Sequence, residues 1–284
     1  MALLPPAAGL DVVAIAARAY ERDRYLTALL APAAARPDLI ALAAFAGEIA
    51  RIPGYVSEPV LGEIRLQWWR DALDAQISGT ATSGHPIADA LGRALQRHRL
   101  DSTLLHGLID AHSARLEAAP FADLPALADN LAASEAAQFT LAGRVLGSAA
   151  ADPALIHDAG QAYGLARLLI ELPATLAEQR CLLPTNLLAA HGATLDRLGE
   201  PEALERLGDI VRQLAATADG AAQRVRGGFR AAPPATRNAL LPVALVRPYL
   251  QACQRGGLGA VQAMDIAPLT RVWRLWLAHR LGRL

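Results

Sequence analysis

Helical periodicity is the feature that most constrains this chain. Residues 201–228 place apolar side chains three, four or seven positions apart, at Leu204, Leu207, Val211, Leu214, Ala218 and Val225. This spacing lines one face of an α-helix. No stretch alternates apolar and polar residues as a half-buried strand does, and no segment repeats along the chain. We therefore predict an all-α protein.

The composition supports a helical core of ordinary size. The 284 residues are 53% hydrophobic, Ala and Leu dominate, and aromatic residues make up only 5%. Ala and Leu favour helix, whereas a mainly β protein is richer in aromatic and β-branched residues. We expect a single domain over residues 1–284, with a core from residue 10 to residue 262 and a last helix from residue 263 to residue 284.

Charge and cysteine content exclude several classes of protein. The 27 acidic residues balance 27 basic ones, all of them Arg, so nucleic acid is not an expected partner. Cys181 and Cys253 have no metal-ligand spacing, and we expect them to be reduced thiols. No charge-free apolar run reaches the ~18 residues that cross a bilayer. The start MALLPPAAGLD lacks the basic region of a signal peptide, so we expect a bacterial cytoplasmic protein.

The apolar patterns predict roughly ten helices. Their ranges are 10–30, 38–52, 59–77, 85–98, 101–117, 123–147, 153–178, 201–228, 236–255 and 264–283. Asp38, Asp101 and Asp152 precede apolar runs and are predicted to begin helices. The segments SGTATSGHP (78–86) and GGFRAAPPATR (227–237) are predicted loops.

Two adjacent tryptophans stand in the predicted helix 59–77, within the segment SEPVLGEIRLQWWRD (57–71). Ser57 or Glu58 precedes Pro59, which suits a first helical turn. Trp68 and Trp69 fall on neighbouring faces of this helix, and we expect both to pack between other helices. Arg65 is one turn from Trp69 and is a candidate for pointing into a cavity.

Several stretches together resemble the squalene/phytoene synthase family. They are RDRYLTALLAPAAARPDLIALAAFAGEIA (22–50), SEPVLGEIRLQWWRDAL (57–73), AGQAYGLARLLIELPATLAEQRCLLPTNLLAAHG (159–192) and LLPVALVRPYLQACQRGG (240–257). The resemblance covers most of the chain in the family's order. It implies the all-helical isoprenoid synthase fold around a central cavity.

The resemblance also implies which residues the family's chemistry requires, and this chain lacks most of them. Active members join two prenyl diphosphates, and Mg²⁺ ions held by two D-x-x-x-D pairs neutralise the leaving diphosphate. Counting from Phe45, the first pair falls at Ala50 and Gly54; counting back from Leu183 and Pro184, the second falls at Glu171 and Thr175. One carboxylate of four survives. We expect no metal site, no cofactor and no prenyl transfer.

Lost aspartates beside an S-E-P…R-L-x-W-W-R-D signature resemble one branch of the family, the mitochondrial complex I assembly factor and its bacterial relatives. This resemblance implies an assembly or accessory factor with a protein partner in respiratory-complex assembly. The alternative is an active prenyl transferase that holds Mg²⁺ in another way, with Glu48, Glu63 and Glu171 as carboxylates.

A ligand in the old cavity is a further expectation. A prenyl diphosphate or an isoprenoid lipid fits the ancestry, and arginines could bind its anionic head group in place of Mg²⁺. The candidate residues for the cavity are Glu48, Arg51, Arg65, Trp69, Arg167, Glu171 and Arg180. Arg167 and Glu171 could instead form an ordinary i,i+4 ion pair, and this reading is favoured.

The C-terminal segment PLTRVWRLWLAHRLGRL (268–284) is basic, amphipathic and contains two tryptophans. Such a helix can lie on an anionic membrane, which would give peripheral contact at the inner membrane. It can also pack on the core with arginines near its C-terminal end, and this packed arrangement is the one that we favour.

Overall fold

The computed structural model describes residues 8–56, 58–79, 83–117, 119–148, 151–193, 201–256 and 265–284. All regular structure in these ranges is helical, which confirms the all-α prediction. The predicted features that fall outside them are the start of the chain before residue 8, Ser57, loop residues 80–82 and the first residues of the last predicted segment, 263–264. No described helix is long and apolar enough to cross a membrane.

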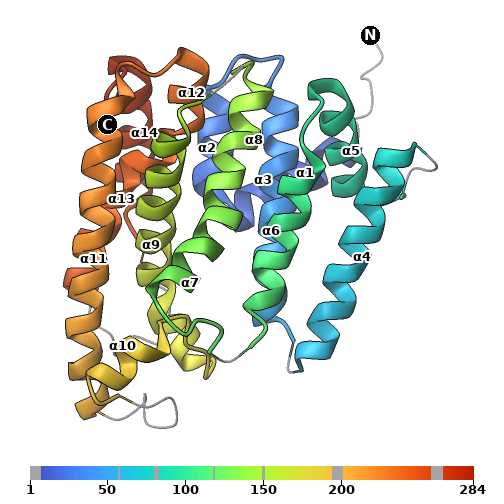
Figure 1. Ribbon diagram of the computed structural model, residues 1–284. Helices are drawn as coiled ribbons and strands as arrows, with labels where there is room; N and C mark the ends of the chain where they lie inside the picture. Colours follow the sequence, from blue (N-terminus) through green and yellow to red (C-terminus); the bar gives the residue numbers. More distant parts are fainter. Residues whose placement is uncertain are drawn as a thin grey trace.

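The N-terminal half of the described chain is a set of six helices joined by short turns (Figure 1). Their bounds are α1 Ala8–Tyr20, α2 Arg22–Leu30, α3 Arg36–Arg51, α4 Pro59–Ser78, α5 Pro86–His98 and α6 Ser102–Ala114, with a 3₁₀ turn, η1, at Ile52–Gly54. In Figure 1, α4 forms one edge of the molecule. The two segments that begin this half were predicted as one helix, 10–30, but Glu21 has a non-helical backbone and divides them.

The C-terminal half contains the two longest helices and ends in α14. The bounds are α7 Leu124–Leu131, α8 Ala137–Val145, α9 Pro153–Ala177, α10 Thr185–Ala190, α11 Pro201–Phe229, α12 Pro234–Ala239, α13 Val246–Gly256 and α14 Pro268–Leu281. A π-helical turn, η2 (Ala132–Ala136), joins α7 to α8, and a 3₁₀ turn, η4 (Leu241–Leu245), joins α12 to α13. The sequence predicted 123–147 and 236–255 as single helices and missed α10.

Local sequence chemistry explains most helix ends. The carboxylates of Asp101 and Asp152 accept hydrogen bonds from the backbone N–H groups of Thr103 and Ala154, as N-caps do. Gly79 adopts the left-handed conformation that ends α4. Asp38 is not an N-cap, because α3 begins two residues earlier; its buried carboxylate instead accepts hydrogen bonds from Arg97.

The core consists of two apolar clusters that meet at the middle of the bundle. One cluster is built largely from α9, α11 and α13, and the other from α1, α3, α5 and α6 with the end of α8. Figure 1 shows α11 and α4 at opposite edges, with α8 and α9 between them. Polar and charged side chains converge where these two clusters adjoin.

The tryptophan pair divides between core and surface. Trp69 is 5% exposed and packs edge-to-face against Phe45 of α3, at 5.3 Å between ring centroids. Trp68 is 42% exposed, so the prediction that both tryptophans are buried is wrong for Trp68. Since α4 is an edge helix, only one of its faces meets neighbours. The cause is tertiary arrangement, which the sequence pattern of α4 did not reveal.

Candidate functional site

The four positions at which the family would carry metal-binding aspartates lie around one polar cavity. Ala50 of α3 lines it from one side, and Glu171 and Thr175 of α9 line it from the other. Gly54 is beside it, since a Cβ placed there would lie 3.5 Å from the Glu178 carboxylate and 3.9 Å from Arg180. The cavity measures about 90 Å³.

An ion-pair network occupies this region, with Glu21 as its most deeply buried member. One Glu21 carboxylate oxygen accepts a hydrogen bond from Arg24 at 2.9 Å, and the other accepts one from Arg167 at 2.6 Å. The Glu21 side chain is 2% exposed. Because Glu21 interrupts the helix between α1 and α2, its backbone break places a carboxylate between two arginines.

Glu135 completes the network from the opposite side. It lies in the π-helical turn and accepts a 2.6 Å hydrogen bond from Arg24, while Arg167 is 3.8 Å away. Burial alone would raise the pKa of this carboxyl, but Arg24 and Arg167 hold that pKa well below its usual range. Burial would likewise lower the pKa of the Arg24 guanidinium, yet Glu135 and Glu21 outweigh burial and raise it. Glu135 and Arg24 are therefore both charged.

Arg167 joins the network to α9. Besides Glu21, it donates two hydrogen bonds to Glu171, at 3.1 and 3.3 Å. The expected i,i+4 pair with Glu171 is thus present, but it is the more exposed part of a larger arrangement. Burial opposes the charge of Arg167, while Glu21 and Glu171 raise its pKa well above the usual value.

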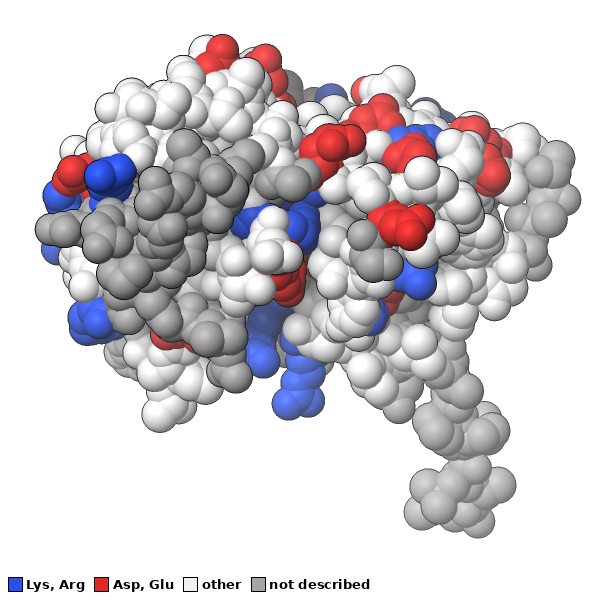
Figure 2. Space-filling view, turned by 90° about the horizontal axis from the view of Figure 1, so that it is seen from below, with Lys and Arg blue, Asp and Glu red and all other residues white. Residues whose placement is uncertain are grey.

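Two further arginines and a histidine face the cavity, and nearby carboxylates compensate less fully for their burial. Arg115 donates to Asn130 and Ser134, and Arg180 donates to the backbone carbonyl of Arg115. Burial lowers the pKa of both guanidinium groups, and nearby carboxylates offset this only in part. Burial, reinforced by Arg115, also lowers the pKa of His112 to about 3, so this imidazole is neutral. Viewed from the end of the molecule where α10 lies, basic and acidic atoms meet in a central hollow (Figure 2).

The residues at this site do not fit Mg²⁺. Magnesium requires several oxygen ligands in octahedral geometry, usually carboxylates. Ala50, Gly54 and Thr175 offer no carboxylate, and Glu171 accepts hydrogen bonds from Arg167. Within the described ranges, no group of three or more His, Cys, Asp or Glu could hold a metal ion.

The carboxylates named for an alternative metal site are separated and paired. Glu48 binds Arg51 at 3.2 Å, and Glu63 accepts from both Arg70 and Ser113 at 2.6 Å. Neither lines the cavity that contains Glu171. These three carboxylates therefore form no common centre.

A second buried network fixes the last helix. Asp23 of α2 accepts a 2.7 Å hydrogen bond from Arg271 of α14 and a 2.8 Å bond from Tyr163 of α9. The Tyr249 hydroxyl also donates to Asp23. Burial and the Asp23 charge raise the pKa of both tyrosine hydroxyls, so both stay protonated and donate.

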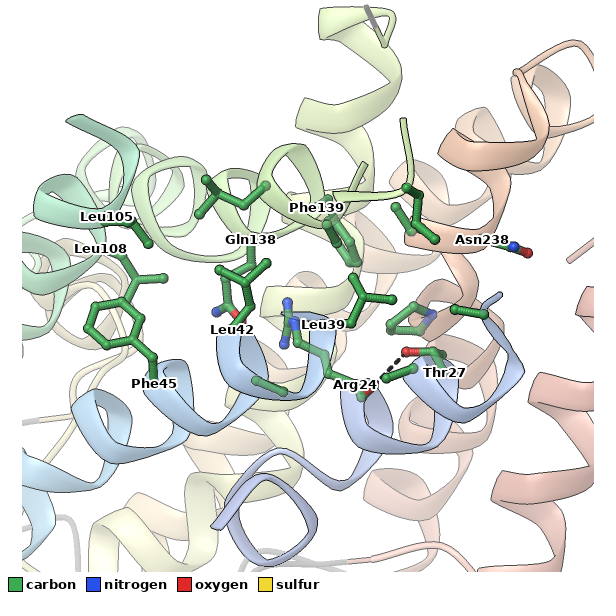
Figure 3. Close-up of a pocket in the computed structure, with 18 residues that line it drawn as sticks. Arg24, Thr27, Leu39, Leu42, Phe45, Leu105, Leu108, Gln138, Phe139 and Asn238 are labelled. Carbon is green, nitrogen blue, oxygen red and sulfur yellow. Dashed lines mark hydrogen bonds between the residues drawn. The ribbon is translucent and has the colours of Figure 1, made fainter. Parts of the chain in front are cut away.

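An apolar cavity adjoins the polar one (Figure 3). Its walls include Leu39, Leu42 and Phe45 of α3, Leu105 and Leu108 of α6, and Phe139 of α8. Arg24 reaches into it from α2, with its guanidinium 5.3 Å from the centroid of the Phe139 ring, and Gln138 borders both cavities. The volume is about 40 Å³, well below the ~150 Å³ of a cavity that admits benzene. This apolar space is therefore too small for a ligand of that size unless its side chains move.

Of the predicted site residues, the structure brings Arg167, Glu171 and Arg180 to the polar cavity. Arg51 lies elsewhere, with its guanidinium 4.1 Å from the Tyr20 ring centroid and 4.4 Å from that of Tyr55. Arg65 is exposed on α4, so the expectation that it points into a cavity is wrong. Trp69 packs in the core and does not line either cavity.

Sequence reasoning missed Glu21 and Arg24 of the ion-pair network, and it also missed Arg115 and Glu135 beside them. A weak signal existed for the first two, because the charged run ERDR (21–24) interrupts an apolar helical pattern. Glu135 stands alone in the Ala-rich segment LAASEAAQF (131–139). A lone acid in such a segment can be exposed or buried, and only its tertiary partners decide which.

Comparison with known protein families matches residues 17–273 to the model described as squalene/phytoene synthase. The chain belongs to the squalene/phytoene synthase family. Over 240 residues, 84% of this chain and 72% of the relative, it is 27% identical to NADH dehydrogenase (ubiquinone) complex I, assembly factor 6 from Bos taurus.

Solved structures of family members share the fold. The chain is similar to squalene synthase HpnC from Alicyclobacillus acidocaldarius, with a TM-score of 0.70 and 19% identity over 88% of this chain and 94% of that chain. It is also similar to a dehydrosqualene synthase in complex with ligand, with a TM-score of 0.75 and 15% identity over 96% of each chain. This family member therefore has the isoprenoid synthase fold, as the resemblance implied.

Proposed function

We propose that this chain is a non-catalytic member of its family that acts as an assembly or accessory factor. The observation that carries the proposal is the replacement of the metal-binding positions by Ala50, Gly54 and Thr175 around a network of paired charges. Ionising a prenyl diphosphate requires cations that neutralise the leaving group. Here the carboxylates of Glu21, Glu135 and Glu171 neutralise arginines of the protein itself.

A turnover assay tests the loss of catalysis. The purified chain is incubated with farnesyl or geranylgeranyl diphosphate and Mg²⁺, while diphosphate release and C30 or C40 products are followed. We expect neither above background, with a catalytically active family member as the positive control. Product formation by folded protein would overturn the proposal in favour of an active prenyl transferase with an unusual metal site.

The partner that we propose is a component of a respiratory complex during its assembly. Support comes from the relatives named as complex I assembly factor 6, to which this chain is similar over most of its length. Deleting the gene in its host should lower the amount of assembled NADH dehydrogenase complex on native gels. A wild-type copy should restore it, and so should the Glu171→Ala variant, which lacks the last aligned carboxylate. Unchanged assembly in the deletion strain would count against this partner.

A prenyl diphosphate or an isoprenoid lipid is the second candidate ligand. The apolar lining beside Arg24 favours it, whereas the small volume of about 40 Å³ requires side chains to move first. In titrations without metal, Arg167→Ala should weaken binding of farnesyl diphosphate, because Arg167 is the cation that borders the polar cavity from α9. Equal affinity of the variant and the wild type would remove this role for Arg167.

We propose the bacterial cytoplasm as the location, with peripheral contact at the inner membrane. Support comes from the basic, tryptophan-containing C-terminal segment and from a partner class that resides in membranes. Fractionation of host cells should find the protein in the membrane pellet at low salt and in the supernatant at high salt, since salt screens surface charge. Recovery in the soluble fraction at both salt concentrations would contradict the membrane contact.

A further inference from the structure

Two helices of this protein present unusually apolar faces to solvent. On α14 the exposed apolar residues are Leu269 (83% exposed), Trp273 (59%), Val272 (50%) and Trp276 (43%). On α4 they are Val60 (66%), Ile64 (61%), Leu61 (48%) and Trp68 (42%). Contiguous exposed patches of this kind mark interaction surfaces.

The outward direction of the α14 face is fixed by the buried ion pair. Arg271 is 4% exposed and bound to Asp23, and Leu275 and Ala278 pack on the core from the same side. At about 100° per residue, Trp273 and Trp276 then point to the opposite side of the helix. Their rings stack at 5.3 Å between centroids and present one aromatic surface. One face of α14 thus packs on the core, and the opposite face is exposed.

The two helices differ in the charged residues that accompany their exposed apolar side chains. From Pro268 to the end of the chain there is no acidic residue, and Arg274, Arg280 and Arg283 are exposed. None of these three arginines forms an ion pair within the described part of the chain. Arg280 lies one turn beyond Trp276, on the same side of the helix as the exposed apolar residues. The solvent-facing part of α4 instead carries charges of both signs, with exposed Arg65, Asp71 and Asp74.

We infer that the outer face of α14 docks on an anionic lipid bilayer. Tryptophan prefers the boundary between head groups and acyl chains, and the apolar stripe supplies area to bury there. Unpaired arginines beside the stripe are complementary to negative head groups. The face on α4 lacks this complementarity. The inference rests on the proposed peripheral location and is independent of whether the cavity binds a ligand.

Vesicle flotation of the full chain tests the inference. Wild type should float with vesicles of phosphatidylglycerol and phosphatidylcholine, and much less with phosphatidylcholine alone. Trp273→Ala combined with Trp276→Ala should weaken binding at least about tenfold through lost apolar burial. Arg280→Glu combined with Arg283→Glu should weaken it by well over tenfold, since each surface arginine contributes roughly fivefold.

The matched control lies on α4. Ile64→Ala combined with Trp68→Ala removes a similar exposed surface and should bind vesicles as wild type does. Helical circular dichroism and the unfolding midpoint of each variant separate lost binding from lost folding.

Each contrary outcome has a distinct meaning. Wild-type binding that survives in both α14 variants would overturn the inference while leaving the peripheral location intact, and loss in the α4 control would place the contact there. Absence of wild-type binding to any vesicle would sink the inference and the peripheral location together, without bearing on catalysis. If the α14 variants instead convert a dimer into a monomer in analytical ultracentrifugation, the face binds a second copy and the lipid inference is wrong.

Discussion

The polar and apolar cavities are neighbours that share Gln138 and differ in what fills them. In the polar cavity, three arginines and three glutamates arrive from the junction of α1 and α2, the turn after α6, the π-helical turn, α9 and the segment after α9. In the apolar cavity, Leu and Phe side chains from α3, α6 and α8 leave about 40 Å³. The fold is the same as that of squalene and dehydrosqualene synthases, and within it the walls of these two cavities differ in kind.

The difference shows that paired charged side chains fill the polar cavity, whereas packed apolar side chains fill the apolar cavity. Buried charges must be paired, because an isolated buried charge is far costlier than a buried pair. Apolar walls need only shape-matched side chains, whose contacts are individually weak and collectively large. The two cavities should therefore respond differently to truncation, and the following experiments are ordered from the largest expected effect to the smallest.

The largest effect is expected for Glu21→Ala. This change removes the carboxylate that accepts hydrogen bonds from both Arg24 and Arg167, and it leaves Glu135 to face both guanidinium groups. Breaking a buried pair by removing one partner typically costs about 3–5 kcal/mol. Urea unfolding followed by circular dichroism measures the loss. Glu48→Ala removes a half-buried pair with Arg51 and is the matched control, with a loss below about 1 kcal/mol. Equal losses would show that the polar cavity is solvated.

Leu105→Ala tests the apolar cavity. Leu105 is fully buried, so truncation should cost about 3 kcal/mol and enlarge the space beside Phe45 and Leu108. The variant should gain measurable affinity for benzene-sized apolar molecules, detected by thermal shift, while wild type does not. Leu61→Ala, on the exposed face of α4, should change stability by less than about 0.5 kcal/mol. A loss below about 1 kcal/mol at Leu105 would mean that the cavity collapses around the truncation.

His112 predicts a pH dependence of stability. Its folded pKa of about 3 lies below the usual histidine value of 6.5, so between these values the unfolded chain binds a proton that the folded chain does not. The contribution of His112 to the free energy of unfolding is fully present above pH 6.5. It falls on acidification by about 1.4 kcal/mol per pH unit between the two pKa values. Between pH 7 and pH 5 the wild type should lose about 2 kcal/mol more than His112→Gln. Exposed His157→Gln is the control, and parallel curves for wild type and His112→Gln would contradict the assignment.

The smallest effect is expected for Glu171→Gln. Its side chain is 46% exposed, and it pairs with Arg167 at the rim of the polar cavity. Solvent screening reduces such a pair to less than about 1 kcal/mol. The unfolding midpoint should barely move, in contrast to Glu21→Ala. A loss as large as that of Glu21→Ala would make Glu171 an equal member of the buried network.

Prediction of the site from the sequence succeeded where one helix carried the information. Arg167 and Glu171 are four residues apart on α9, and their pairing needs no neighbour. The Glu21–Arg167 and Arg24–Glu135 pairs were missed because the partners lie more than a hundred residues apart. Arg65 was misplaced because the pattern of α4 gives two plausible inner faces, and only its edge position selects one.

The sequence by itself determined the helical class and most helix ends, since these depend on local spacing and residue type. The tertiary structure decided which charges are buried together, how little space the cavities keep and which face of α14 stays outside. The physical reason is that burial and ion pairing are properties of packed neighbours. A side chain such as Arg271 reads as one more surface cation until Asp23 lies opposite it.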